Sequence, residues 1–219
     1  MLRLLFEKKG NAVWVSHLDL MRLFQRAFKR AGLPLVHSKG FNPRASVSIA
    51  LPLSVGIESC CELLDFELEG ISIPCEEIRD RLNAALVSGI RVLEVYNDGM
   101  KLKHLALLNC RLSFEYDAGI PEGTQEALTE LFASPSLLIE KRGKNGTIEQ
   151  DIIPMIRHIS IGREDAYTVE IDAVVCCKEP TLNPMQLGAA VEKYLPEYRP
   201  DHMKYCRVEI YDTQENIFR

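Results

Sequence analysis

Two kinds of hydrophobic periodicity alternate along this 219-residue chain, and their order constrains the fold more than any other feature. Alternation with a period of two predicts a half-buried strand, and apolar residues at spacings of three or four predict an amphipathic helix. In the first hundred residues these patterns predict strands over 1–9, 45–53, 62–69 and 90–96, and helices over 16–31 and 74–86. The element order is therefore βαββαβ, the split pattern of ferredoxin-like folds.

The same order of elements returns after the turn signal Asn97-Asp98-Gly99. Here the patterns predict strands over 105–116, 136–142, 167–175 and 205–211, and helices over 121–132 and 183–194. The run Gly143-Lys144-Asn145-Gly146 is a hairpin signal, and irregular or short strand structure is expected after it. We therefore expect an α+β protein with two ferredoxin-like units in tandem, 1–99 and 100–219, the second with an inserted hairpin.

Composition indicates where in the cell the protein is expected and whether it is expected to bind a cofactor. The apolar runs are far shorter than the roughly 20 residues of a membrane-spanning helix, and the N-terminus lacks a secretory signal pattern, so we expect a cytoplasmic protein without membrane contact. The seven cysteines form no CxxC motif, and their odd number argues against a disulfide framework. The pairs Cys60-Cys61 and Cys176-Cys177 would point to opposite faces of a strand, so no bound metal or other cofactor is expected.

Charge is unevenly distributed along the chain. Residues 1–50 contain nine Lys or Arg and two Asp or Glu, a formal charge of +7. Residues 51–219 contain 17 Lys or Arg and 29 acids, a charge of −12, so the net charge of −5 conceals a basic first quarter. Such an asymmetry indicates an anionic partner without identifying it.

The first predicted helix carries a cationic face opposite its apolar stripe. Arg22, Arg26, Lys29 and Arg30 fall within about 100° of one another around the helix axis. A solvated helix face would explain this pattern. The alternative is a surface that follows successive phosphates, because guanidinium groups bind phosphate oxygens in pairs.

The segment that follows this helix mixes cations, an aromatic residue and a flexible glycine. It contains Lys39, Gly40, Phe41, Asn42 and Arg44. Phe41 could stack on a nucleobase while Lys39 and Arg44 hold the backbone, as in proteins that bind single-stranded RNA. Alternatively, Phe41 packs inward and the next two residues form a simple turn.

Catalytic signals are sparse. His17 and Asp19 lie in the first turn of the predicted helix and are weak candidates for a general base and its partner. Trp14 stands between two valines and is predicted to lie in the core or to form a hydrophobic staple. The alternation of Asp65, Glu67 and Glu69 along one strand face is explained by a solvated strand edge. An enzyme is therefore the less favoured interpretation.

Several short motifs resemble the N-terminal signature of one bacterial family. They are SHLDLM at 16–21, AGLP at 31–34, SKGFNP at 38–43 and SIALPL at 48–53, followed by Gly56 and Glu58-Ser59. Over residues 3–68 the chain is similar to the radical-SAM-linked family, a domain of unknown function. Its members are fused behind a radical-SAM module or stand alone, often encoded near a ribonuclease of the E/G type. The resemblance implies a role in RNA metabolism or partnership with a radical-SAM enzyme.

One residue departs from the family pattern, because Arg44 stands where members often have histidine. Arginine keeps a positive charge and hydrogen-bond donors but does not transfer protons near neutral pH. Three hypotheses follow. The first is a non-catalytic module that binds or helps mature RNA, either tRNA or rRNA. The second is an interaction module that docks on a radical-SAM protein, and the third is an RNA-modifying or RNA-processing enzyme.

Overall fold

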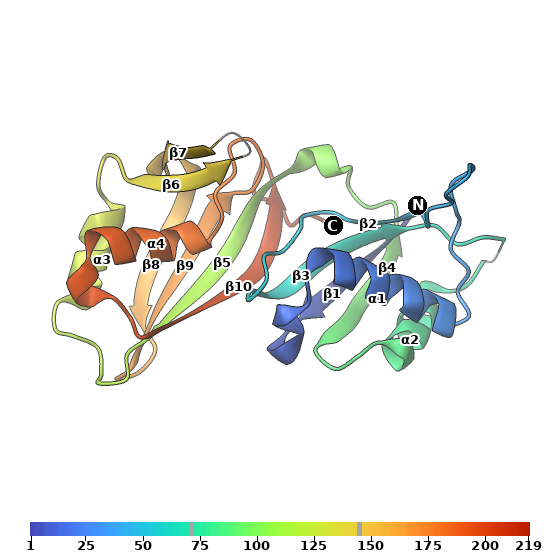
Figure 1. Cartoon of the computed structure of the whole chain (residues 1–219), viewed down its shortest axis with the longest axis horizontal. Coiled ribbons are helices and arrows are strands. Elements are labelled where there is room, and N and C mark those ends of the chain that lie inside the picture. Colours follow the sequence, from blue (N-terminus) through green and yellow to red (C-terminus); the bar gives the residue numbers. More distant parts are fainter. Residues whose placement is uncertain (71, 144–145) are drawn as a thin grey trace. The chain divides into compact units, whose positions relative to one another are not determined.

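A computed structural model describes residues 1–70, 72–143 and 146–219, and these form two compact units. Unit 1 comprises Met1–Lys103 together with Arg219, and unit 2 comprises His104–Phe218. Both combine antiparallel strands with α-helices, so the protein is of the mixed α+β class (Figure 1). Among the described residues, no helix is long and apolar enough to cross a bilayer.

Unit 1 alternates strands and helices in the order expected from the sequence. Its elements are β1 (Leu2–Lys8), the 3-10 helix η1 (Gly10–Trp14), α1 (His17–Arg30), β2 (Val47–Ile49), β3 (Glu58–Phe66), α2 (Cys75–Ala85) and β4 (Ile90–Asn97). The strands pair antiparallel in the order β4-β1-β3-β2. A short 3-10 helix, η2 (Leu102–His104), follows.

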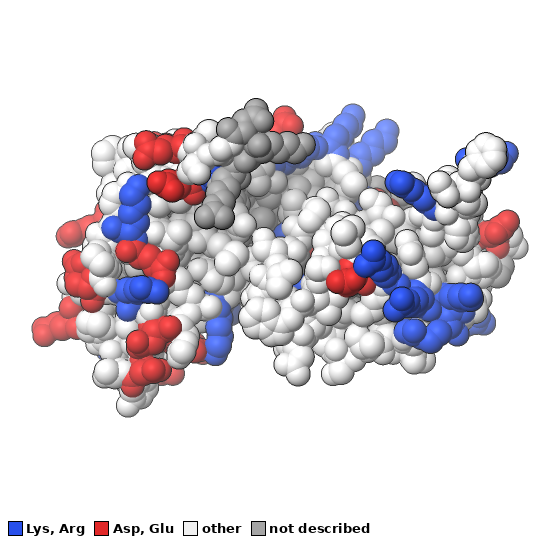
Figure 2. All heavy atoms as spheres, in the orientation of Figure 1, with Lys and Arg blue, Asp and Glu red and all other residues white. Residues whose placement is uncertain are grey.

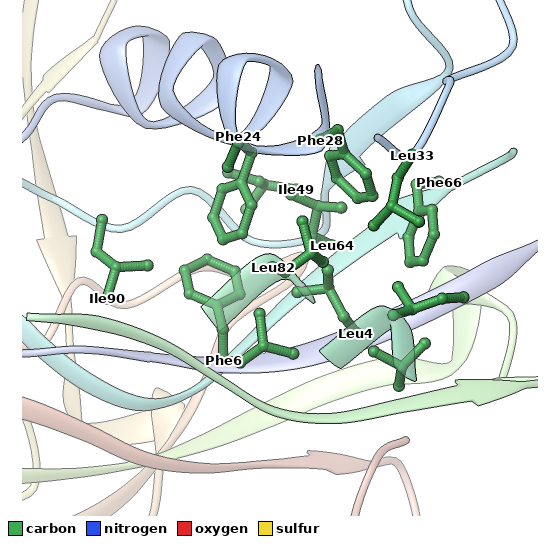
Figure 3. Packing of buried hydrophobic residues seen from close by; sticks show 14 of the residues in the cluster. Leu4, Phe6, Phe24, Phe28, Leu33, Ile49, Leu64, Phe66, Leu82 and Ile90 are labelled. Carbon is green, nitrogen blue, oxygen red and sulfur yellow. The ribbon is translucent and has the colours of Figure 1, made fainter. Parts of the chain in front are cut away.

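Helices α1 and α2 cover one face of the unit 1 sheet because alternate residues of its strands are apolar. Phe6 of β1 meets Phe24 of α1 edge to face, with ring centroids 4.8 Å apart. Phe28 of α1 packs on Phe66 of β3 with centroids 4.9 Å apart. All four rings are fully buried, and they fix the position of α1 on the sheet (Figure 3).

Unit 2 repeats the alternation with a hairpin added. Its elements are β5 (Leu105–Glu115), α3 (Thr124–Phe132), β6 (Leu138–Gly143), β7 (Gly146–Asp151), η3 (Ile153–Met155), β8 (Ile156–Arg163), β9 (Thr168–Cys176), α4 (Met185–Tyr194), η4 (Pro196–Tyr198) and β10 (His202–Asp212). Its main sheet has the antiparallel order β10-β5-β9-β8, and β6 pairs with β7 separately. The predicted turn residues 144 and 145 lie outside the described residues.

Close packing explains the glycine inside α4. A Cβ atom at Gly188 would collide with the Tyr205 hydroxyl and the Met203 sulfur of β10. A larger residue would push α4 away from the sheet, so the helix loses some intrinsic stability in exchange for this contact.

Five local predictions were wrong. The strand predicted over 136–142 is β6, which pairs with β7 outside the main sheet, and β8 takes the expected place beside β9. The strand predicted over 45–53 is only β2, because Pro52 has no amide hydrogen for a ladder. The strand predicted over 62–69 is β3, whose limits follow its pairing with β1. Trp14 is 71% exposed, since the chain leaves η1 with its indole directed outward. Asp65 is not a solvated carboxylate: it binds the buried Arg3 with Oδ1 2.6 Å from Nε and Oδ2 3.1 Å from Nη2.

Candidate nucleic-acid interface

The start of α1 is held by a side-chain cap and by a buried lysine. Ser16 Oγ accepts the Asp19 backbone N–H at 3.3 Å and donates to the Asp19 carboxylate at 2.7 Å. Lys8 of β1 donates from Nζ to the carbonyl oxygens of Val13 (3.1 Å) and Val15 (2.9 Å), and burial lowers its pKa. The Asp19 carboxylate bonds the Ser16 hydroxyl, whereas the acidic side chain of a capping box bonds the backbone amide of the cap residue.

Two arginines of the predicted cationic face have structural partners. Arg22 donates from Nη1 to the Asp19 carboxylate at 3.0 Å. Arg30 donates from Nη2 to the carbonyl oxygen of Ala85 at 2.6 Å, in the last turn of α2. A cation at that position satisfies a free carbonyl and balances the negative end of the helix dipole. Arg30 therefore joins α1 to the end of α2, whereas Arg22 pairs with an acid on its own helix.

Arg26 and Lys29 differ from these two arginines. Both side chains are exposed, and neither has a hydrogen bond or an ion pair within the described part of the chain. On unit 1, Lys and Arg atoms gather over α1 (Figure 2). Neither cation has to break an ion pair before it meets an anionic ligand, although the Asp19 carboxylate lines the same groove as Arg26 and their charges interact.

Grooves lie on both sides of the exposed ridge of α1. The first, the α1–α2 groove, has a volume of about 490 Å³, and its lining includes Arg22, Arg26, Arg30 and the half-exposed Val87. The second, the α1–loop groove, has a volume of about 700 Å³ and lies between α1 and the segment that follows it. Lys29 lines the second groove, so the four predicted cations do not act on a single flat face.

The segment after α1 forms a closed loop, here called the 37–44 loop. A bridge pairs His37 with Ala45. The Ser38 N–H donates to the Arg44 carbonyl at 2.8 Å, and the Arg44 N–H donates to Ser38 Oγ at 2.9 Å. These bonds fix the base of the loop, so its tip is presented from a defined position.

The tip of the 37–44 loop is turned to solvent. Lys39, Gly40, Phe41, Asn42 and Arg44 are all exposed, and Phe41 is fully exposed at 107% relative accessibility. Gly40 has φ = +142°, a conformation that residues with a Cβ rarely adopt. The alternative in which Phe41 packs inward does not occur, and the ring is available for stacking.

The sequence of this chain matches the profile of one protein family. The family profile with the description "Uncharacterized protein conserved in bacteria (DUF2344)" matches residues 1–184, most of the chain. The chain belongs to this family. The match includes α1, the 37–44 loop and both grooves of this DUF2344 protein.

Comparisons with other proteins add little to the family assignment. A comparison of this DUF2344 protein with curated proteins finds no match. A chain in the crystal structure of a Cbf5-Nop10-Gar1 complex is similar at 11% identity and a TM-score of 0.49, with 95% of this chain and 48% of that chain covered. The DUF2344 protein thus spans about half the length of that chain. An unknown protein from Galdieria sulphuraria is similar at 11% identity and a TM-score of 0.26, with coverages of 94% and 97%.

The two weak catalytic candidates do not form a base and its partner. The Asp19 carboxylate is bonded to Ser16 and Arg22, and these two hydrogen bonds lower the pKa of Asp19. His17 is half-buried, and no hydrogen bond joins it to Asp19 among the described contacts. Asp19 therefore remains an ionised structural carboxylate near neutral pH.

The cysteines of this DUF2344 protein are free thiols in the structure. Burial raises the pKa of Cys110 and of Cys177 to about 12, so both stay protonated at neutral pH. Within the described ranges, no cluster of three or more His, Cys, Asp or Glu side chains is arranged to hold a metal ion.

Sequence reasoning missed two polar residues of the α1–loop groove. His37 lines the groove, and its Nδ1 lies 2.8 Å from the Leu35 carbonyl oxygen, so Nδ1 carries a proton and donates to that oxygen. Glu69 also lines the groove, and its N–H donates to the Pro34 carbonyl at 2.9 Å. Glu69 follows β3 and is far from α1 in the chain, so no local pattern could have grouped it with Lys29.

Proposed function

We propose that this protein is a non-catalytic RNA-binding or RNA-maturation accessory module, which holds single-stranded RNA on α1 and the 37–44 loop. The observation that carries the proposal is the fully exposed Phe41 at the tip of a loop whose base is closed by hydrogen bonds. The exposed cations Lys39 and Arg44 lie in the same loop. A buried ring would favour a structural role. An exposed ring offers a stacking surface to any base.

Two physical effects would act together in this surface. Stacking of a base on an aromatic ring contributes about 1–3 kcal/mol per base and tolerates any sequence. Cations without acidic partners release counterions when they meet phosphates, which makes binding strongly dependent on salt. Arg26 and Lys29 would supply this second effect, and Asn42 could donate to a base edge or to the backbone.

The direct test is fluorescence anisotropy of the purified protein with labelled tRNA and with labelled single-stranded RNA over a series of salt concentrations. We expect Arg26→Ala with Lys29→Ala to weaken binding and to reduce the slope of log affinity against log salt by about 1.4, at about 0.7 per cation on a single strand. Arg30 is left intact because its loss would also disturb α2.

A matched control removes one arginine and one lysine elsewhere. Lys103 and Arg157 are exposed and have no side-chain partner among the described contacts, so Lys103→Ala with Arg157→Ala changes the net charge equally. The control should leave affinity and salt slope close to those of the unmodified protein. Equal losses in both double variants would show a general charge effect and would refute the assigned surface.

The scaffold that we propose for this role is two ferredoxin-like units in tandem, with a boundary near residue 100. The support is a correspondence between the strand orders β4-β1-β3-β2 and β10-β5-β9-β8, which match element by element when the hairpin of β6 and β7 is set aside. We place the role in the cytoplasm, where tRNA and rRNA are found.

A second candidate function is docking on a protein partner, with a radical-SAM enzyme as the partner to test. It is favoured by Trp14 and Leu18, which are 71% and 66% exposed next to the start of α1. Tryptophan is enriched among the residues that contribute most to the binding energy of protein interfaces. The candidate predicts a complex at micromolar concentration that Trp14→Ser with Leu18→Ser abolishes, and unchanged RNA affinity in that variant.

A further inference from the structure

The α1–loop groove has the dimensions of a small-ligand site. Its volume is about 700 Å³, and ligand pockets in proteins usually range over roughly 300–1,000 Å³. Met21 of α1, Pro34 just after the helix and Pro43 of the 37–44 loop contribute an accessible apolar lining. Phe28 and Leu33 lie beneath this lining in the buried core, so the floor of the groove is rigid.

Charged groups stand around this apolar lining. Lys29 and Arg44 contribute exposed side chains from two different elements, α1 and the 37–44 loop. Neither side chain has a polar partner among the described contacts, although the Arg44 backbone is hydrogen-bonded to Ser38. An apolar surface beside two free cations is complementary to a ligand with a flat apolar part and a phosphate.

We propose that the α1–loop groove holds one unstacked nucleotide, with guanine as the preferred base. The base lies against the apolar lining, and its phosphate meets Lys29 and Arg44. This inference rests on the proposed RNA-binding function and names the unit of RNA that the site selects. Phe41 would then stack on a neighbouring base outside the groove.

Glu69 is the reason for the choice of guanine. An ionised carboxylate only accepts hydrogen bonds, and its two oxygens accept two parallel donors. The Watson–Crick edge of guanine presents two adjacent donors, whereas adenine, cytosine and uracil each present an acceptor next to a donor. The Glu69 N–H donates to the Pro34 carbonyl at the groove, and the exposed Glu69 side chain lines the groove, so its carboxylate can reach a base that lies there.

The experiment uses the six methionine methyl groups as probes of the full-length protein. Met21 lines the groove, and the other five methionines do not, so they serve as internal controls. Protein labelled with ¹³C at the methionine methyls is titrated with guanosine 5′-monophosphate, and Met21→Leu assigns the resonance. We expect a selective shift of Met21, with affinity for guanosine monophosphate about tenfold higher than for the adenosine, cytidine or uridine monophosphates.

Two variants and one RNA pair complete the design. Lys29→Ala with Arg44→Ala should lower the affinity for guanosine monophosphate several-fold. Glu69→Gln should remove the preference for guanine over the other bases. An octauridylate with one central guanosine should shift the methyl resonance of Met21. It should also bind about tenfold more tightly than octauridylate itself. Gln125→Ala, on α3 of unit 2, is the control substitution and should change none of these values.

The outcomes separate this inference from the proposed function. If RNA binds with the expected dependence on Arg26 but Met21 does not shift, the groove proposal is overturned and the RNA-binding function stands. If guanosine monophosphate shifts Met21 but neither RNA binds, the groove is a nucleotide site and the RNA-binding function fails. Equal binding of all four mononucleotides would overturn the assignment of guanine and the role of Glu69.

Discussion

Four cations of α1 and the 37–44 loop differ from Arg111 and Lys204 of the unit 2 sheet, because only the latter two form ion pairs with carboxylates. In unit 2, Arg111 of β5 has its Nε 3.2 Å from the Asp172 carboxylate and 3.7 Å from Glu170, both on β9. Lys204 of β10 bonds Glu115 of β5. In unit 1, Lys39 and Arg44, like Arg26 and Lys29, form no ion pair among the residues that the structure describes, although the charge of Arg26 helps to lower the pKa of Asp19.

This difference explains why the same residue types suggest different roles. A cation beside carboxylates must give up or share those partners before it can bind phosphate, so part of its electrostatic attraction is cancelled. A cation without them contributes its full charge to an incoming anion. Cations of α1 and the 37–44 loop that form no ion pair should therefore attract an anion more strongly than Arg111 and Lys204 of unit 2 do.

Breaking the buried ion pair of unit 1 should have the largest effect. Arg3 and Asp65 have side chains only 6% and 12% exposed, so Asp65→Ala leaves a buried guanidinium without its carboxylate. We expect a loss of about 3–5 kcal/mol in the free energy of unfolding, measured with urea. As a control, Glu77→Ala breaks an exposed pair with Arg81 and should cost less than about 0.5 kcal/mol. Similar losses in the two variants would contradict this ranking.

Removing the exposed ring should weaken RNA binding without changing stability. Phe41→Ala is expected to cost about 1–3 kcal/mol of binding free energy, which anisotropy titrations measure. The melting temperature should not change, because the ring contacts solvent and not the core. Phe41→Trp should keep the affinity. A lower melting temperature in Phe41→Ala would instead indicate a structural ring.

Arg30 and Arg26, one turn apart on α1, should separate a structural cation from a free one. Arg30→Ala removes the bond to the Ala85 carbonyl and should lower stability by roughly 0.3–1 kcal/mol. Arg26→Ala should leave stability unchanged and reduce the salt slope of RNA binding. Thermal melts and salt titrations of both variants test these two expectations. A stability loss in Arg26→Ala with a reduced salt slope only in Arg30→Ala would show that the two roles are reversed.

The smallest effect is expected at the paired cation of unit 2. Arg111→Ala should leave RNA affinity unchanged and cost less than about 1 kcal/mol of stability, because the ion pair with Asp172 is partly exposed. A marked loss of RNA affinity in this variant would show that paired cations also bind RNA. The comparison between the two regions would then fail.

The order of the secondary elements was predictable because it depends on local periodicity. The apolar stripe of α1 and the alternation in β1 are set by spacing alone, so the helix predicted over 16–31 corresponds closely to α1. The limits of β2 and β3 were not predictable, because a strand extends as far as its partner offers hydrogen bonds. Trp14 was misplaced because η1 interrupts the alternation on which the prediction relied.

Some features of the candidate interface were likewise predictable from the sequence, and others were not. The sequence by itself determined which residues are cationic, that α1 carries several of them on one side, and that a glycine-containing segment with Phe41 follows. The tertiary structure alone decided that Arg30 is bonded to α2, that Phe41 points to solvent, and that Glu69 joins Lys29 around one groove. The physical reason is that charge and helical phase are local properties, whereas partnership and exposure depend on residues brought together from distant parts of the chain.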